Sequence, residues 1–450
     1  MEAILLKIKS RNKWWETGAV PEREKKLKRE GYLKLIRPTF GNRKVLGIIG
    51  LRRTGKTTLV VQAIDHLLTQ GTAPEQILYV LMEDVAGDIK TIDELISKYR
   101  DIADVNMDKE TYIFIDEIHL MKNWQMQLKS YYEGGKKIKF IVSSSSSTLL
   151  YKDAVESLVG RIQFISVAPL SLGEFLDFHG IKIEIEPDAG SLEFEPLKKA
   201  YLKLHSEEML RIFKEYMNVG GYPEWFEIKN TDRWKKTLAE EYLALILFRD
   251  VVRVFRARDP VLLESLTRYA ALNSSSRMYY SKLASETGSD IETVKLYLNY
   301  LATAGIIQIS NYYTRGKTES RKEKKMYFGE AGMMNALYPM DEGKTVETLV
   351  AINLLHVIRR SGHIFENLFY WKNKHEVDCV FESKGSLLPV EVKYREDPSI
   401  IEGLLEFMED YSVDRGIVVT KDLLERKIID GREIIFIPAW LFLLALDYVG

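Results

Sequence analysis

Residues 50–58 read Gly50-Leu51-Arg52-Arg53-Thr54-Gly55-Lys56-Thr57-Thr58 and match the pattern G-x-x-x-x-G-K-[ST] of a phosphate-binding P-loop. An apolar run at 45–49 precedes them and a helical pattern at 59–64 follows, which is the setting that the motif requires. The glycines let backbone N–H groups face a phosphate, and the positive end of the helix dipole adds to the attraction. Lys56 would reach the β- and γ-phosphates, and Thr57 would hold Mg²⁺. The stretch therefore predicts a site for ATP or GTP.

Around the P-loop, short apolar runs alternate with helical patterns. This rhythm predicts a parallel β-sheet covered by helices, which we assign to a P-loop ATPase core at 45–170. Residues 1–44 form a basic segment with a helical pattern. The expected strands are 45–49, 77–81, 112–115, 139–142 and 162–167.

Two carboxylates follow the apolar run Tyr112-Ile113-Phe114-Ile115. A continuous apolar run is typical of a fully buried strand, and its end would deliver both acids beside the P-loop. We expect Asp116 to act through Mg²⁺ and Glu117 to act as the general base on the attacking water.

A run of serines follows the expected strand at 139–142. Ser143, Ser144 and Ser145 are candidates for a polar contact with the γ-phosphate or the water, with Ser143 placed first. The alternative is a Ser-rich turn without a catalytic role.

Arg161 directly precedes the expected strand at 162–167. Ring-forming ATPases place an arginine finger there, which stabilises charge on the transferred phosphoryl group. The alternative is a structural ion pair. The sequence does not decide whether the arginine would serve its own site or that of a neighbouring copy.

The middle of the chain predicts a helical lid at 171–255 and a winged helix at 256–330. A short helix at 280–287 joins a second helix, opened by a capping box at 289–292, through a tight glycine turn. The hairpin at 312–327 carries six basic and two acidic residues, a local excess of +4 that would favour DNA phosphates. The alternative is a packing domain with a solvated, charged hairpin. The basic residues are Arg315, Lys317, Arg321, Lys322, Lys324 and Lys325.

Residues 331–450 bring acids onto two apolar strand patterns. Asp378 and the pair Glu391-x-Lys393 match the PD-(D/E)xK nuclease pattern, and Glu347 lies in a helical pattern upstream. We expect Glu347, Asp378 and Glu391 to ligate Mg²⁺, and Lys393 to orient water and stabilise charge at phosphorus. The alternative is a relic of such a site that binds DNA or a partner.

Composition narrows the class of protein. The 450 residues carry a formal net charge of −1, so a nucleic-acid surface would have to be a local patch. The single cysteine, Cys379, excludes an internal disulfide and favours a reducing, cytoplasmic compartment. The apolar stretch at 435–446 is shorter than the roughly 20 residues that span a bilayer, so we expect no membrane segment.

These motifs together resemble the archaeal and bacterial predicted AAA-type ATPases of the STAND-related group. The resemblance implies a multidomain α/β protein with a P-loop core, a helical lid, a winged helix and a restriction-endonuclease-like C-terminal domain. It also implies that Gly221 and Pro223 lie near adenine. The sensor strand departs from the family's Gly-Ser-Ser, because this chain has Ser143-Ser144-Ser145. The resemblance rests on 50–58, 115–119, Trp124, 157–161, 169–175 and 220–223.

The leading hypothesis is an ATP-hydrolysing, Mg²⁺-dependent machine coupled to DNA through the winged helix and the basic hairpin. The alternative is a STAND-like switch in which ATP controls assembly with a protein partner and the nuclease-like domain is inactive. A scaffold that binds nucleotide with negligible turnover is a third interpretation. A homo-oligomer fits each of them.

Overall fold

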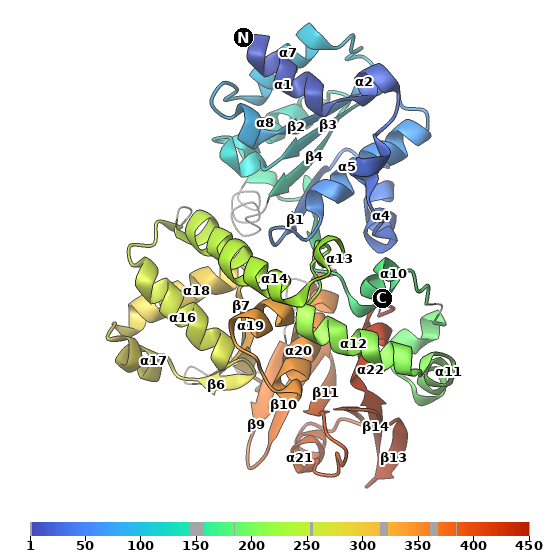
Figure 1. The fold of residues 1–450 in the computed structure, drawn as a ribbon, viewed down its shortest axis with the longest axis vertical. Helices are drawn as coiled ribbons and strands as arrows, with labels where there is room; N and C mark the ends of the chain where they lie inside the picture. Colours follow the sequence, from blue (N-terminus) through green and yellow to red (C-terminus); the bar gives the residue numbers. More distant parts are fainter. Residues whose placement is uncertain are drawn as a thin grey trace. The chain divides into compact units, whose positions relative to one another are not determined.

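The computed structural model describes residues 2–144, 157–183, 185–252, 255–315, 323–360, 368–383 and 385–449. The chain forms two compact units, Met1–Ala168 and Pro169–Gly450 (Figure 1). The boundary between the units lies close to the end expected for the ATPase core. The finer division of the second unit into lid, winged helix and nuclease-like domain stays a prediction.

The first unit is built on a parallel sheet of five strands in the order β2-β3-β4-β1-β5 (Figure 1). All five expected strands are confirmed. Because the strands are parallel, their carboxyl ends meet at one edge, where the P-loop and the acids after β3 come together. The strands are β1 (Val45–Gly50), β2 (Ile77–Leu81), β3 (Thr111–Asp116), β4 (Ile138–Ser144) and β5 (Ile162–Val167).

Helices cover both faces of this sheet. Alternate residues of β3 point to opposite faces, so Ile113 packs in one apolar layer and Phe114 in the other. The helices are α1 (Glu2–Arg11), α2 (Trp14–Thr17), α3 (Glu22–Lys25), α4 (Glu30–Ile36), η1 (Arg37–Gly41), α5 (Lys56–Thr69), η2 (Pro74–Gln76), α6 (Met82–Val85), α7 (Ile92–Ile102), η3 (Ile118–Leu120) and α8 (Trp124–Glu133).

The N-terminal segment closes the open edge of the sheet. Asn12 donates to Tyr79 O at 2.8 Å and accepts from Tyr79 N at 2.7 Å, as a neighbouring strand would. The indoles of Trp14 and Trp15 both donate to Ile77 O, at 3.1 and 2.9 Å. These side chains satisfy backbone groups of the edge strand β2, which would otherwise invite pairing with another chain. The basic helical segment is therefore part of the first unit.

Helices also make up the first part of the second unit, as expected for residues 171–250. Those helices are α10 (Leu172–Phe178), η4 (Pro187–Ser191), α11 (Phe194–Leu204), α12 (Glu207–Val219), α13 (Trp225–Ile228), α14 (Thr231–Lys236) and the π-helical segments η5 (Thr237–Tyr242) and η6 (Leu245–Val252). The later helices are α16 (Pro260–Leu272), α17 (Tyr280–Thr287), α18 (Ile291–Thr303), α19 (Ala331–Leu337), α20 (Glu342–Arg360), α21 (Glu402–Asp410) and α22 (Ala439–Leu446).

A mixed sheet of nine strands runs through the rest of this unit, in the order β13-β14-β12-β11-β10-β9-β7-β8-β6. Its strands are β6 (Ser276–Met278), β7 (Ile307–Tyr312), β8 (Lys324–Phe328), β9 (Leu368–Lys372), β10 (Glu376–Ser383), β11 (Ser386–Lys393), β12 (Arg415–Thr420), β13 (Glu425–Ile429) and β14 (Arg432–Pro438).

The expected basic wing is different from a free hairpin. Strand β7 lies inside the sheet, antiparallel to β8 and parallel to β9, with Tyr312 opposite Tyr370. Lys324 and Lys325 are 7% and 1% exposed, so neither presents its charge to a phosphate backbone. Arg315 is exposed. Lys317, Glu319, Arg321 and Lys322 lie outside the described residues.

The start of α18 also differs from the expected capping box. The N-cap is Asp290, one residue later than expected, and its Oδ1 accepts from Thr293 N at 2.8 Å. A carboxylate at this position accepts an N–H that the helix leaves unpaired, and it also favours the positive end of the helix dipole.

The apolar stretch at 435–446 forms the end of β14 and the buried helix α22. In the described part of the chain, no helix has both the length and the apolar character needed to cross a bilayer.

Candidate nucleotide site and C-terminal charged cluster

The P-loop connects β1 to α5 as expected. Gly50 has φ of 150°, and a Cβ there would lie 2.2 Å from Val167 O of the neighbouring strand β5, so only glycine fits. Gly55 has φ of 93° and precedes the first helical residue, Lys56. The glycines of the motif thus serve the turn that directs α5 toward the sheet edge.

A buried arginine from the N-terminal segment holds this loop. Arg29 is 4% exposed and donates to Thr54 O and to Ala168 O, both at 2.8 Å. Its guanidinium lies 4.5 Å from the ring centroid of Tyr32, whose hydroxyl accepts from Ala168 N at 2.9 Å. Arg29 was not predicted, because one basic residue in a basic segment has no distinguishing pattern.

The two functional side chains at the start of α5 lie against the loop and the sheet. Lys56 is 6% exposed, and its Nζ donates to Gly50 O at 3.0 Å and Leu51 O at 2.7 Å. Thr57 Oγ1 donates to Asp116 Oδ2 at 2.7 Å. The hydroxyl and carboxylate expected to share a cation are therefore adjacent.

Asp116 is the last residue of β3 and is surrounded by donors. Its Oδ2 also accepts from the hydroxyl of Tyr79, at 3.1 Å, and its Oδ1 accepts from Glu117 N, at 3.1 Å, and from the hydroxyl of Ser143. Burial, and then Asp116, raise the pKa of Tyr79 well above its ordinary value, so Tyr79 stays a neutral donor. Ser143 lies on the end of β4 beside Asp116, and its sensor role stays a prediction, whereas Tyr79 was missed because its strand resembles any other buried strand.

Glu117 is held in an unusual conformation. Its φ of 56° and ψ of 44° lie in the left-handed region, which residues other than glycine adopt at an energetic cost. Such backbone outliers cluster at functional sites. His119 Nδ1 lies 3.2 Å from Glu117 Oε2 and 2.9 Å from Ser144 Oγ. The imidazole therefore links the expected base to the end of β4. Ser145 lies outside the described residues.

The oxygens of Thr57 and Asp116 suit a hard cation such as Mg²⁺, which takes oxygen ligands and usually binds through one or two carboxylates together with substrate phosphates. In this part of the molecule the expected donors fit the expected ion. Across the described ranges, however, no three His, Cys, Asp or Glu side chains form a metal-binding group by themselves. The phosphates of a nucleotide would have to complete the coordination.

Arg161 lies at the other end of the sheet from its own P-loop. Its O accepts from Val45 N at the start of β1, whereas the P-loop follows Gly50 at the end of that strand. Val167, which pairs with Gly50, lies six residues further along the chain than Arg161, a span of roughly 20 Å in a strand. Its guanidinium forms an ion pair with Glu133 at 2.9 Å. A role at its own site is therefore excluded, and only a role in another copy stays a prediction.

Gly221 and Pro223 belong to the second unit, where Gly221 has a packing reason of its own. Leu170 N donates to Gly221 O at 2.6 Å, and Gly221 N donates to Glu330 Oε1 at 3.0 Å. A Cβ at Gly221 would lie 2.4 Å from Leu170 O. This close approach explains the glycine without a ligand, and the adenine role of both residues stays a prediction.

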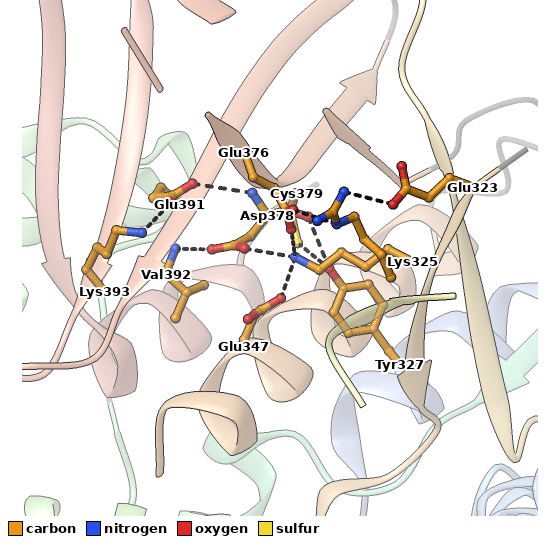
Figure 2. Close-up of polar contacts among 11 residues, drawn as sticks. Glu323, Lys325, Tyr327, Glu347, Glu376, Asp378, Cys379, Glu391, Val392 and Lys393 are labelled. Carbon is orange, nitrogen blue, oxygen red and sulfur yellow. Dashed lines mark hydrogen bonds and ion pairs between the residues drawn. The ribbon is translucent and has the colours of Figure 1, made fainter. Parts of the chain in front are cut away.

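The C-terminal acids do gather, on three neighbouring elements. Asp378 lies on β10 and Glu391 and Lys393 lie on the adjacent β11, while Glu347 projects from α20 (Figure 2). Asp378 Oδ2 accepts from Val392 N at 2.9 Å, and Asp378 N donates to Glu391 Oε2 at 3.3 Å. Lys393 donates to Glu391 Oε1.

A lysine that the sequence analysis assigned to the wing occupies the centre of these acids. Figure 2 shows Lys325 extending from β8 toward Glu347 and Asp378. Its Nζ lies 2.7 Å from Glu347 Oε1, 2.8 Å from Glu376 Oε1 and 2.8 Å from Asp378 Oδ1. The contacts to Glu376 and Asp378 are hydrogen bonds, and the contact to Glu347 is an ion pair without hydrogen-bond alignment. Nothing in the sequence pattern singles out Glu376, and the expected wing misplaced Lys325.

Burial and mutual charge determine the protonation of this cluster. Burial alone would lower the pKa of Lys325, but Asp378 and Glu347 hold it well above its ordinary value. Burial would raise the pKa of Asp378, but Lys325 keeps it below its ordinary value. Burial and the charge of Asp378 raise the pKa values of Glu347 and Glu391 to about 8. The ammonium and Asp378 are therefore the charged pair at neutral pH.

The geometry does not fit the expected Mg²⁺ at Glu347, Asp378 and Glu391. An ammonium already contacts two of these acids, Lys393 pairs with the third, and in the described part of the chain these acids form no metal-binding group. The metal-ligand hypothesis for these residues stays without support from the structure.

Three family models match segments of the chain. Residues 42–176 match the AAA domain. Residues 210–344 match a Domain of unknown function (DUF8612), and residues 342–441 match a second Domain of unknown function (DUF4143). The first unit thus has the fold of a P-loop AAA-type ATPase. Lys325 lies in the first of the two other domains, and its carboxylate partners lie in the second.

Related proteins extend over most of the chain. The uncharacterized protein MJ1544 of Methanocaldococcus jannaschii is 28% identical over 381 residues, which cover 82% of this chain and 78% of that protein. An uncharacterized protein of Haemophilus influenzae is 23% identical over 427 residues, which cover 92% and 98%. AMPPCP-bound DnaA from Aquifex aeolicus, a solved structure, aligns at a TM-score of 0.27 and 15% identity over 63% of this chain and 89% of that one. A TM-score this low adds nothing to the family match.

Proposed function

We propose that this chain is a Mg²⁺-dependent ATPase whose nucleotide state controls the second unit. The observation that carries the proposal is the direct contact between Thr57 and Asp116, which joins the P-loop helix to the acid-bearing strand. This contact supports the proposal because an alcohol and a carboxylate are the oxygen ligands that would hold Mg²⁺ beside a bound nucleotide. The AAA domain match at 42–176 supports the same function.

In this proposal each residue acts from the position that it holds. The N–H groups of the P-loop and the ammonium of Lys56 bind the phosphates. Thr57 and Asp116 would hold Mg²⁺, which would supply charge neutralisation at the phosphates. Glu117 takes the proton of the attacking water, with His119 orienting its carboxylate. Ser143 and Tyr79 keep Asp116 in position.

The test compares ATP binding with ATP turnover in two variants. Lys56→Ala should lose nucleotide binding, measured with a fluorescent ATP analogue, and with it hydrolysis. Glu117→Gln should bind the analogue like the unmodified chain, but its turnover should fall by roughly 10²-fold or more, because general-base catalysis contributes about that much. Undiminished hydrolysis in Lys56→Ala would refute the site, and lost binding in Glu117→Gln would refute the role of Glu117 as base.

For the output, we propose DNA as the first partner, through the surface of α18 and the exposed Arg315. Lys295 and Asn299 are exposed on that helix, although Lys295 also pairs with Glu292 at 2.7 Å. Binding to labelled single-stranded and duplex DNA at low salt, with and without ATP, tests this. Lys295→Ala should weaken binding and reduce its salt dependence, since each phosphate contact contributes to that slope.

One observation favours the alternative output, a switch with a catalytically silent C-terminal domain. Lys325 occupies the centre of the acids that nuclease chemistry would need, and Lys393 is paired with Glu391. In a switch, ATP controls assembly with a protein partner. Sizing the chain with ADP and with a non-hydrolysable ATP analogue tests it. ATP-dependent assembly together with no DNA affinity would replace the DNA proposal by the switch.

A further inference from the structure

The cluster around Lys325 has the arrangement of a cation site whose cation belongs to the chain. The Nζ atom has oxygens of three carboxylates within 2.8 Å, and the lysine is 1% exposed. The carboxylates come from α20 and β10, and the lysine comes from β8 (Figure 2). An ammonium has three protons to donate, and here it donates to Glu376 and Asp378 and lies in ion-pair contact with Glu347. We propose that Lys325 is a built-in cation that replaces a divalent metal ion in this nuclease-like centre.

The backbone of Lys325 is fixed by strand pairing on both sides, which keeps its side chain in the cluster. Strand β8 pairs on one side with β6 and on the other with β7, so Lys325 lies opposite both Arg277 and Ser310. Its ammonium also lies 5.8 Å from the ring centroid of Tyr327, which is completely buried. A metal ion could enter only by displacing an ammonium that the sheet holds in place. A metal ion bound by the same carboxylates would lie close to the ammonium, and two positive charges close together in a buried site repel strongly.

Other carboxylate oxygens of the cluster also lie beside donors. Asp378 Oδ2 accepts from Val392 N, and Glu391 is paired with Lys393. Glu376 Oε2 lies 3.3 Å from Arg277 Nε. Acidic clusters bind metal when their negative charge is not compensated, and here three cations from the chain supply the compensation. The cations of the chain therefore already contact the carboxylates that Mg²⁺ or Mn²⁺ would need as ligands.

Lys325 is also in the wrong state to act on a substrate. A lysine that stabilises charge at phosphorus has to present a proton to the reacting group. The protons of Lys325 are directed to carboxylates in the protein interior. Its function is to hold two family domains together, since the lysine lies in residues 210–344 and its three partners lie in residues 342–441. This inference does not depend on the proposed ATPase activity.

The experiment is a Mn²⁺ titration of the full nucleotide-free chain, followed by the electron paramagnetic resonance of free Mn²⁺. Any Mn²⁺ that the unmodified chain binds with a dissociation constant below about 100 µM should be bound at the P-loop. Thr57→Ala, which removes the P-loop ligand, should therefore abolish that binding. Lys325→Met should create one site per chain, at least tenfold tighter than any in the unmodified chain. Adding Asp378→Asn to Lys325→Met should remove that site.

Lys324→Met is the matched control. Lys324 precedes Lys325 on the same strand, is also buried, and donates to Asn311 Oδ1 at 2.5 Å on the opposite face. It should create no site. A site in the unmodified chain that persists in Thr57→Ala and is lost in Asp378→Asn would overturn the proposal. A folded Lys325→Met chain that binds no Mn²⁺ would overturn it as well. The titration of the unmodified chain remains decisive if Lys325→Met does not fold.

Discussion

The hydroxyl of Thr57 donates to Asp116 Oδ2 at 2.7 Å, although 58 residues separate the two in the chain. The contact fixes the first turn of α5 against the end of β3. It also leaves Asp116 dependent on neighbours that the sequence motif does not include, above all the hydroxyl of Tyr79, which binds the same oxygen. A small change beside this carboxylate should therefore alter the use of the metal ion.

Tyr79→Phe should raise the Mg²⁺ concentration needed for half-maximal ATP hydrolysis by roughly 10-fold, because groups that orient a metal ligand contribute about that much to metal affinity. The maximal rate should change little, since the general base and the P-loop remain. The measurement is the ATPase rate against Mg²⁺ at saturating ATP. Tyr112→Phe, which removes a hydroxyl from the neighbouring strand, is the control and should leave the Mg²⁺ dependence unchanged. An unchanged dependence in Tyr79→Phe would contradict the role given to its hydroxyl.

Arg161→Ala should leave the rate per chain unchanged when the protein is dilute, because the side chain lies at the opposite end of the sheet from its own P-loop. If the arginine acts on a neighbouring copy, a loss of up to roughly 10³-fold should develop only at concentrations where copies assemble. The rate is measured against protein concentration, with light scattering to follow assembly. Glu133→Ala breaks the same ion pair but keeps the arginine, so it distinguishes the effect of losing the ion pair from the effect of losing Arg161. A loss in dilute, monomeric protein would contradict the assignment.

Gly221→Ala should destabilise the second unit by about 1–3 kcal/mol, the usual cost of overpacking a buried site. The added Cβ would meet Leu170 O at 2.4 Å and Leu170 N at 2.9 Å, and both are backbone atoms that cannot rotate away. Urea unfolding should show the lower midpoint. Gly343→Ala is the matched control, because a Cβ there meets only the side chain of Asp341, at 3.1 Å. An unchanged midpoint in Gly221→Ala would show that the connection between α12 and α13 yields more readily than its hydrogen bonds suggest.

Loss of the proton of Asp447 should make the second unit less stable as pH rises from about 4 to about 6. Burial raises the pKa of Asp447 to about 6, so the folded chain binds its proton more tightly than the unfolded chain. The contribution that protonation makes to stability is complete below the unfolded pKa and is lost as pH rises through the folded pKa. The loss amounts to less than about 3 kcal/mol, the value for two pKa units.

The check is the urea midpoint at stepped pH in Asp447→Asn. The amide oxygen can still accept from Ser171 Oγ and Gly173 N, which contact Asp447 Oδ2 at 2.8 and 3.2 Å, but it cannot titrate. The midpoint should therefore fall less between pH 4 and 6 than in the unmodified chain. Glu402→Gln, a change of the same charge at an exposed position, should keep the original slope. Equal slopes in Asp447→Asn and the unmodified chain would rule out Asp447 as the source.

The sequence by itself determined the first unit and the positions of its principal acids. All five strands, the P-loop turn and the adjacency of Asp116 to Thr57 follow from local patterns, because the carboxyl ends of parallel strands must meet at one edge. Asp378 and Glu391 come together for a different reason, because they lie on neighbouring antiparallel strands, β10 and β11.

Only the tertiary structure decided what surrounds those residues. Arg29 and Tyr79 reach the P-loop and Asp116 through packing between segments that no periodicity connects. Lys325 is one of several basic residues of a charged hairpin in the sequence, yet the pairing of β8 with β6 and β7 directs it into the carboxylate cluster. A lysine is the same residue in the sequence whether its ammonium lies at the surface or in a buried site. Whether it meets phosphate or an internal carboxylate depends on long-range strand pairing, which residue type and spacing do not encode.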